Sequence, residues 1–294
     1  MSLLVTAVFL GQVVNPYLLD IGQPGQVTAS RGYTISDSGE KTSVPTIAKA
    51  AKGVRFVLFG ESHTSPDHHR AQAEVIEMLV KSGRKVIVGF EMFTRDNQAS
   101  LAAWSKGTQT EADFIEKSNW KTQWGFDFAL YKPIFDMTKA HKLPMVALNV
   151  PRDWVRQVGR EGIGVLTTEQ RKWVPDPYLL CTEHKQVFTA LMGGHPLTGS
   201  RGENIYAAQV TWDEGMATTA VDYMNEHHKA DPNAVMVIVV GSGHVMYGQG
   251  INYRIMRKTG EKSISIIAID SEEPLPVSKG IGDFIFVSPP PKKA

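Results

Sequence analysis

Apolar runs of strand length recur along the chain, separated by segments with helical spacing. The first four runs cover residues 54–59, 85–90, 144–148 and 234–240, and shorter ones follow at 263–269 and 284–287. Between the first two runs, residues 66–82 carry apolar side chains at helical intervals and stop before Gly83, a common residue at helix ends. A strand, a helix and a strand of these lengths form a right-handed unit with parallel strands. The pattern therefore predicts an α/β fold, with a mostly parallel sheet and helices on both faces.

Polar residues follow each of the first four apolar runs. They are Glu61 and His63, then Glu91, Asn149 and His244. Because the carboxyl ends of parallel strands meet at one edge of a sheet, where open α/β sheets bind ligands, we expect these side chains to converge. Both histidines close a Gly-x-x-His turn. Four polar strand ends in succession favour a ligand-binding or catalytic site.

Two long segments leave the predicted sheet, at about 92–142 and 165–230. The first should contain helices at 97–106, 111–117 and 128–142, and it is dense in aromatic residues. Its aromatic side chains predict either a small helical core or an apolar lid, and both can hold. The topology places such helical insertions over the carboxyl edge of the sheet.

The second insertion includes a long helix predicted over residues 204–228. On this helix Gln209 and Asp213 are four residues apart and flank an apolar stripe. An amide and an acid in that position usually support other groups, although a direct role at the rim stays open.

The first 40 residues form a predicted N-terminal segment, and residues 41–294 a single α/β domain with its insertions. Residues 2–14 are mostly apolar and favour a targeting remnant, but no Lys or Arg precedes them and no small-x-Ala site follows closely, so a first strand is the alternative. Residues 15–42 are rich in Gly and Pro, and a short hairpin is expected around 26–35.

Composition limits the classes of function. With 42% hydrophobic and 21% charged residues, the 294-residue chain can build a large core, and its formal net charge of +1 argues against a nucleic-acid partner. The single cysteine, Cys181, cannot form an internal disulfide, and it lies too far inside the chain to be a lipidated lipobox cysteine. A buried, inert thiol is expected there.

The predicted rim supports three kinds of chemistry. Histidines and glutamates from separate strands could bind Zn, Mn, Co or Fe. Without a metal, Glu61 or Glu91 could polarise His63 to activate a water or an alcohol. A polar network that only holds the loops is the third reading. Neither a Gly-x-Ser-x-Gly elbow nor a phosphate-binding glycine fingerprint is present, which disfavours phosphate binding.

Several segments together resemble one known family. They read GESH at 60–63 with DHH at 67–69, FEMF at 90–93, AQVTWDEGMA at 208–217 and GSGH at 241–244 with Gly248-x-Gly250. In this order they resemble the ChaN haem-binding uptake proteins of the Tiki/erythromycin-esterase superfamily. The resemblance covers about residues 54–287.

This resemblance implies two functions. The resemblance to ChaN-like proteins implies haem binding in bacterial iron uptake, at the periplasmic side of the cell envelope. It also implies that a tyrosine ligates the haem iron and that haems pair in a dimer. Tiki-like members imply a metal-dependent protease that would use His63, Glu91 and His244 with a divalent metal, and erythromycin esterases use a related histidine as a base. In a hydrolase of either kind, Glu61 would join these three as a catalytic candidate.

The expected function is haem binding, with a metal-dependent hydrolase as the alternative. A phenolate is a known axial ligand of haem iron. The candidate ligands are the four tyrosines of the insertions and the glycine loop, Tyr131, Tyr178, Tyr206 and Tyr247. Tyr247 follows the rim histidine most closely, whereas Tyr131 lies on the apolar face of its helix, where core packing is the more usual role.

Overall fold

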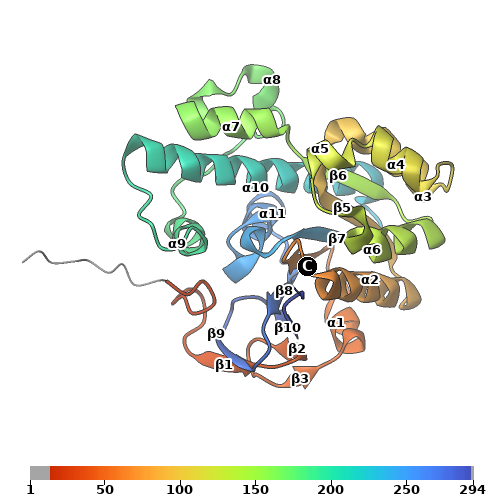
Figure 1. Ribbon diagram of the computed structural model, residues 1–294, viewed down its shortest axis with the longest axis horizontal. Coiled ribbons are helices and arrows are strands. Elements are labelled where there is room, and N and C mark those ends of the chain that lie inside the picture. The colour runs from red at the N-terminus through yellow and green to blue at the C-terminus, as the bar shows by residue number, and fades with distance from the viewer. Residues whose placement is uncertain (1–13, 293–294) are drawn as a thin grey trace, which may run out of the picture.

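The computed structural model describes residues 14–292 (Figure 1). The predicted targeting segment, residues 2–14, therefore lies outside the described residues except for Val14. None of the helices between residues 14 and 292 combines the length and the apolar character that crossing a bilayer requires.

An eight-stranded sheet forms the centre of the fold, in the order β3-β2-β10-β8-β4-β7-β5-β6. Its strands are β2 (Gly32–Ile35), β3 (Lys41–Thr42), β4 (Phe56–Glu61), β5 (Lys85–Thr94), β6 (Met145–Asn149), β7 (Ala234–Gly241), β8 (Ile264–Asp270) and β10 (Phe284–Ser288). All neighbours from β10 to β6 are parallel, whereas β2 runs antiparallel to both β3 and β10. The mostly parallel α/β sheet is thus confirmed, and β4, β7, β5 and β6 are consecutive neighbours.

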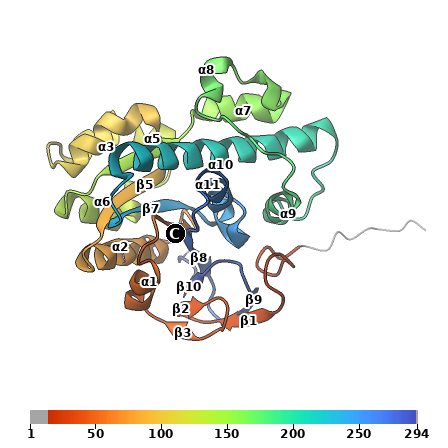
Figure 2. The same cartoon turned by 180° about the vertical axis from the view of Figure 1, so that it is seen from behind.

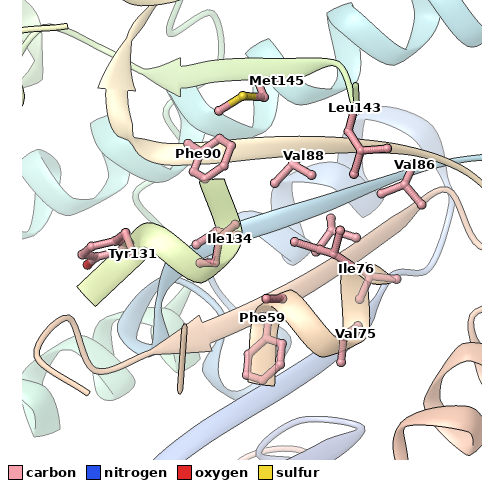
Figure 3. Packing of buried hydrophobic residues seen from close by; sticks show 14 of the residues in the cluster. Phe59, Val75, Ile76, Val86, Val88, Phe90, Tyr131, Ile134, Leu143 and Met145 are labelled. Carbon is pink, nitrogen blue, oxygen red and sulfur yellow. The ribbon is translucent and has the colours of Figure 1, made fainter. Parts of the chain in front are cut away.

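Alternate residues of the strands point to opposite faces, and different helices cover each face. The first face packs against α1 (Val44–Ala50), α2 (Pro66–Lys81) and the helices of the first insertion. Figure 3 shows this layer, with Phe59, Val88 and Phe90 of the sheet beside Ile76 of α2 and Ile134 of α6 (Phe128–Ala140). The opposite face packs against α9 (Thr182–Leu191), α10 (Gly199–His228) and α11 (Ile251–Thr259).

The first insertion folds largely as a helical core of its own. Its helices are α3 (Gln98–Ser105), α4 (Glu111–Lys117), α5 (Trp120–Gln123) and α6 (Phe128–Ala140), close to the predicted bounds. Trp104, Phe114 and Phe135 are almost fully buried and in mutual aromatic contact. The aromatic residues at 124 and 126, between α5 and α6, line a cavity at the carboxyl edge of the sheet, and the Tyr131 hydroxyl reaches Glu61 at the end of β4.

Helix α7 (Arg152–Glu161) and α8 (Thr168–Arg171) lie beyond α10, on the side away from the sheet (Figures 1 and 2). Val155 and Val158 of α7 pack with Ala207 of α10 in a small separate core. The end of α7 that follows β6 lies at the carboxyl edge, so the helix forms one wall above it.

The N-terminal strands pair differently from the predicted hairpin. The strand β1 (Gln26–Ala29) pairs with β9 (Leu275–Ser278), while β2 joins the main sheet beside β10. Local turn residues at 30–32 suggested a hairpin, but each strand finds a partner from the C-terminal part of the chain. The apolar face of β2 is thereby buried, with Tyr33 packed on Phe286 of β10.

Candidate functional site

The polar residues predicted to converge do meet at one edge of the sheet. Glu61 and Asn149 are the last residues of β4 and β6, and His63 and His244 lie in the turns after β4 and β7. Strand β5 continues past Glu91 to Thr94, but its pairing with β6 shifts register between Phe90 and Thr94. Such an irregularity re-aims side chains, and here it accompanies a Glu91 side chain that reaches the rim.

Glu61 is a buried anion beneath the rim. Its Oε1 atom accepts hydrogen bonds from the Tyr131 hydroxyl at 2.7 Å and from Nδ1 of His63 at 2.9 Å, and its Oε2 lies 3.3 Å from Nε2 of His69. Burial alone would raise the pKa of this carboxyl, but the contacts to His63 and His69 outweigh it, so the pKa lies well below its usual range. A charged Glu61 fixes Nδ1 of His63 as the protonated nitrogen.

His63 is the most accessible member of this group, with 31% of its side chain exposed. The imidazole stands edge-on to Trp124, with ring centres 4.7 Å apart, and contacts Phe126 as well. Its other nitrogen, Nε2, is turned toward Gly241: a Cβ atom at Gly241 would lie 2.9 Å from Cε1 and 3.2 Å from Nε2. Glycine is therefore needed at position 241 to leave room for the imidazole.

A second imidazole–carboxylate pair lies beside the first. Nε2 of His244 is 3.4 Å from Oε1 of Glu91, and Nδ1 is 2.5 Å from Oδ1 of Asp213. Burial opposes the charged imidazolium, but Glu91 and Asp213 outweigh it and raise the pKa of His244 to about 10. His244 is thus a cation at neutral pH, and the amide of Gln209 lies 3.0 Å from its Nδ1.

The pairing continues behind Asp213 into the protein. Oδ2 of Asp213 lies 2.9 Å from Nε2 of His184 on α9, and Nδ1 of His184 lies 3.0 Å from the Tyr206 hydroxyl. The guanidinium of Arg254, 1% exposed, is 3.7 Å from the same carboxylate oxygen. This chain of buried polar groups ties α9, α10 and α11 to His244.

The two Gly-x-x-His turns also touch each other. A Cβ atom at Gly60 would lie 2.7 Å from the backbone Cα of Ser242, a distance that real Cβ atoms do not show. Gly60 therefore allows the turn after β7 to pack against the end of β4. This approach brings His63 and His244 to the same side of the rim.

A cavity of about 560 Å³ opens above the two histidines. This volume is in the range of small-molecule binding sites. Its floor is polar and consists of His63, Glu91, Gln209 and His244. Its walls are mainly apolar and include Met92, Trp124, Phe126, Val150, Val155, Phe188, Ile205, Ala208 and Trp212. Both insertions thus contribute to the cover of the site, and Gln209, which was predicted to flank an apolar stripe, lines the cavity directly.

The four candidate tyrosines lie elsewhere. The Tyr131 hydroxyl binds Glu61, that of Tyr206 donates to the Cys181 carbonyl, and that of Tyr247 donates to the Pro16 carbonyl at 3.0 Å. Burial raises the pKa of all three phenols, which disfavours a phenolate. Tyr178 stacks on Arg257, whose guanidinium is 4.5 Å from the ring. Within the described residues, none of the four lines the cavity over the histidines.

The rim also differs from an open metal site. Across residues 14–292, no group of three or more His, Cys, Asp or Glu residues is arranged to hold a metal ion. The candidate ligands Glu91 and His244 are already paired with each other, and Oε2 of Glu91 accepts the Gly241 amide at 2.7 Å. His63 also lines the cavity, and its Nε2 has no protein hydrogen bond among the described residues.

Sequence reasoning missed His184 and Arg254 and placed Asp213 only on the edge of a buried stripe. A lone histidine on the amphipathic helix α9 carries no signal of its partner, because Asp213 is distant in sequence. Cys181, for which a buried thiol was predicted, is buried and directly precedes α9.

The open, mostly parallel sheet and the imidazole–carboxylate pairs under an apolar cavity define a class: α/β proteins that bind a ligand, or act on one, at the carboxyl edge of the sheet. Comparison with known families is more specific. The model for "Haem-binding uptake, Tiki superfamily, ChaN" matches residues 47–255, and the chain belongs to this family.

Three known proteins illustrate the range of similarity. The structure described as "Cofacial heme binding to ChaN of Campylobacter jejuni" shares the fold with a TM-score of 0.62, at 16% identity, over 89% of this chain and 98% of that one. Protein RETICULATA-RELATED 5, chloroplastic, from Arabidopsis thaliana is 25% identical over 290 residues, which cover 90% of this chain. The chain spans only 38% of the length of that curated relative. An erythromycin esterase, EreC, in its open conformation matches more distantly, with a TM-score of 0.45 at 13% identity over 80% of this chain and 76% of that one.

Proposed function

We propose that this protein binds haem in the cavity above His63 and His244. The observation that carries the proposal is the combination of mainly apolar walls with His63, a partly exposed imidazole that lines the cavity and whose Nε2 has no hydrogen bond among the described residues. Haem needs an apolar slot for its ring and a nitrogen, sulfur or phenolate ligand for its iron. The family to which the chain belongs supports the same ligand.

His63 is the proposed axial ligand. Its Nδ1 is held by Glu61, so Nε2 is the nitrogen that would bind the iron. Burial opposes the charged imidazolium, but Glu61 and Glu91 outweigh it and raise the pKa of His63, so the iron would compete with a proton at Nε2. The aromatic rings at Trp124, Phe126 and Trp212 would contact the porphyrin. Bound haem would supply an iron centre for ligand or electron exchange, whereas the protein would provide the pocket and the imidazole.

Haem titration of the purified full-length chain, read by visible absorption, tests this proposal. We expect a saturable spectrum for the unsubstituted protein and its loss or a change of ligand type in His63→Ala. Tyr131→Phe, Tyr178→Phe, Tyr206→Phe and Tyr247→Phe should keep the spectral type. A tyrosinate-type spectrum that disappears in one of these tyrosine variants would show that this tyrosine, and not His63, is the ligand. The absence of saturable binding would refute the function.

A hydrolase is the second candidate function, and the two adjacent imidazole–carboxylate pairs favour it. In this alternative His63, polarised by Glu61, removes a proton from water, while the His244 imidazolium stabilises the developing oxyanion. The arrangement needs no metal ion and corresponds to the metal-free reading of the rim, whereas the resemblance to Tiki-like members implied a metal-dependent protease. A screen of ester and peptide substrates with the metal chelated tests it, and activity unchanged in His63→Ala or Glu61→Gln would refute it.

The biological setting is also a proposal: haem or iron uptake at the cell envelope, as a homodimer. Exposed apolar side chains around α9 support self-association, with Leu180 at 77%, Leu191 at 40% and Met192 at 46% exposure. Light scattering with and without haem tests the dimer, and a monomer at all protein and haem concentrations would refute it. Fractionation of cells that express the complete protein tests the location.

A further inference from the structure

One face of α7 lines the cavity and carries two positive charges. The residues on this face are Arg152, Val155, Arg156 and Gly159. Their spacing of three and four residues places them on one stripe of the helix. The rim histidines come from the strand ends and the two arginines from α7, so the cavity has charged groups on two different elements among mainly apolar walls.

Both guanidinium groups keep donors for a ligand. Nη2 of Arg152 donates to the Gln123 carbonyl at 2.9 Å, and Nη1 of Arg156 pairs with Asp153 at 3.2 Å. The second pair is exposed to solvent, with 59% and 87% of the two side chains accessible, and such pairs are weak. Since a guanidinium has five N–H donors, each arginine can bind a further acceptor.

The neighbouring acids do not cancel this charge inside the cavity. Glu91, the carboxylate among the lining residues, is paired with the His244 cation at the floor. Asp96 and Asp153 do not line the cavity and lie with both arginines around a second hollow of about 280 Å³. A carboxylate on a bound ligand would therefore compete only with solvent-exposed acids.

We propose that Arg152 and Arg156 select ligands that combine a flat apolar body with carboxylates at one end. For haem, which the proposed function requires, these carboxylates are the two propionates. Guanidinium groups bind carboxylates with paired hydrogen bonds, so α7 would set the direction in which the macrocycle enters. The inference rests on the proposed function but names a separate specificity determinant.

The experiment compares haem with its dimethyl ester, which has the same ring and no free carboxylates. Both are titrated into the full-length protein, the double variant Arg152→Gln/Arg156→Gln and the control Arg160→Gln. Arg160 is exposed on α7 and does not line the cavity. We expect the unsubstituted protein and the control to prefer haem over the ester by about tenfold, and the double variant to lose this preference.

A second pair of probes separates this inference from the proposed function. These are 2-naphthoic acid and 2-naphthamide, detected by quenching of Trp124 and Trp212, which line the cavity. If neither porphyrin binds, the haem function fails, yet an acid preference that disappears in the double variant would still support the arginine pair. Equal binding of acid and amide, no binding of either, or a preference that the double variant retains would overturn it.

Discussion

The Nδ1 atom of His244 and the Oδ1 atom of Asp213 are 2.5 Å apart, which joins the turn after β7 to the middle of α10. Asp213 is fully buried and also faces His184 and Arg254. The rim cation is therefore held from behind by a carboxylate that never reaches the cavity. Removal of the Asp213 carboxylate should affect the stability of the protein and the charge of His244 together.

Asp213→Asn should destabilise the protein by about 3 kcal/mol near pH 6, because it leaves a buried imidazolium with one carboxylate partner fewer. The pKa of His244 is raised to about 10 in the folded protein, above the usual value of 6.5. Its ion pairs therefore stabilise the fold fully below about pH 6.5, and this contribution is lost as the pH rises through about 10. The penalty should shrink between pH 6 and pH 10. Urea unfolding across this range measures it.

Glu169→Gln is the matched control for that experiment. Glu169 pairs with Lys172 on the surface, where 77% and 65% of their side chains are exposed, and we expect a change below about 0.5 kcal/mol at every pH. A pH-independent loss in Asp213→Asn would show that the carboxylate acts through packing and not through the charge of His244.

Tyr131→Phe should cost about 2 kcal/mol of unfolding free energy. The change removes a 2.7 Å hydrogen bond to the buried Glu61 carboxylate without altering the aromatic packing of the ring. Tyr178→Phe is the control, since this half-buried tyrosine contacts Arg257 through its ring face. Chemical denaturation compares the two, and equal stabilities would mean that Glu61 is satisfied without the phenol.

Gly241→Ala should weaken haem binding about tenfold or more, because the new methyl group overlaps the His63 imidazole at 2.9 Å. Gly164→Ala is the control, as nothing lies within 4 Å of its added Cβ atom. Both variants should fold, and thermal melting verifies this. Unchanged haem affinity and spectrum in Gly241→Ala would argue that His63 moves freely and does not ligate the iron.

The convergence of Glu61, His63, Glu91 and His244 could be predicted because parallel neighbours bring their strand ends to one edge. That inference needs only apolar runs and a βαβ unit, both of which are local signals. The helices of the first insertion were likewise predictable from spacing, with the observed α4 matching residues 111–117.

The details of the site depend on contacts that are distant in sequence. His184 and Asp213 meet only because α9 and α10 pack side by side, and no local pattern records that contact. Tyr247 follows the rim histidine by three residues, yet its backbone has φ of 58° and its hydroxyl turns to Pro16 in the N-terminal segment. The pairing of β1 with β9 was missed for a similar reason, since Pro276 hides the strand character of residues 275–278.

The close approach of Gly60 to Ser242 makes the two histidine turns a single structural unit. A side chain at position 60 would press on backbone, which cannot yield as a flexible side chain does. The packing of each turn thus limits the substitutions that the other can accept. A substitution in one turn should need a compensating change in the other, on the neighbouring strand. An engineer who transplants one imidazole–carboxylate pair into another sheet would need to carry over both turns and the strand contact between them.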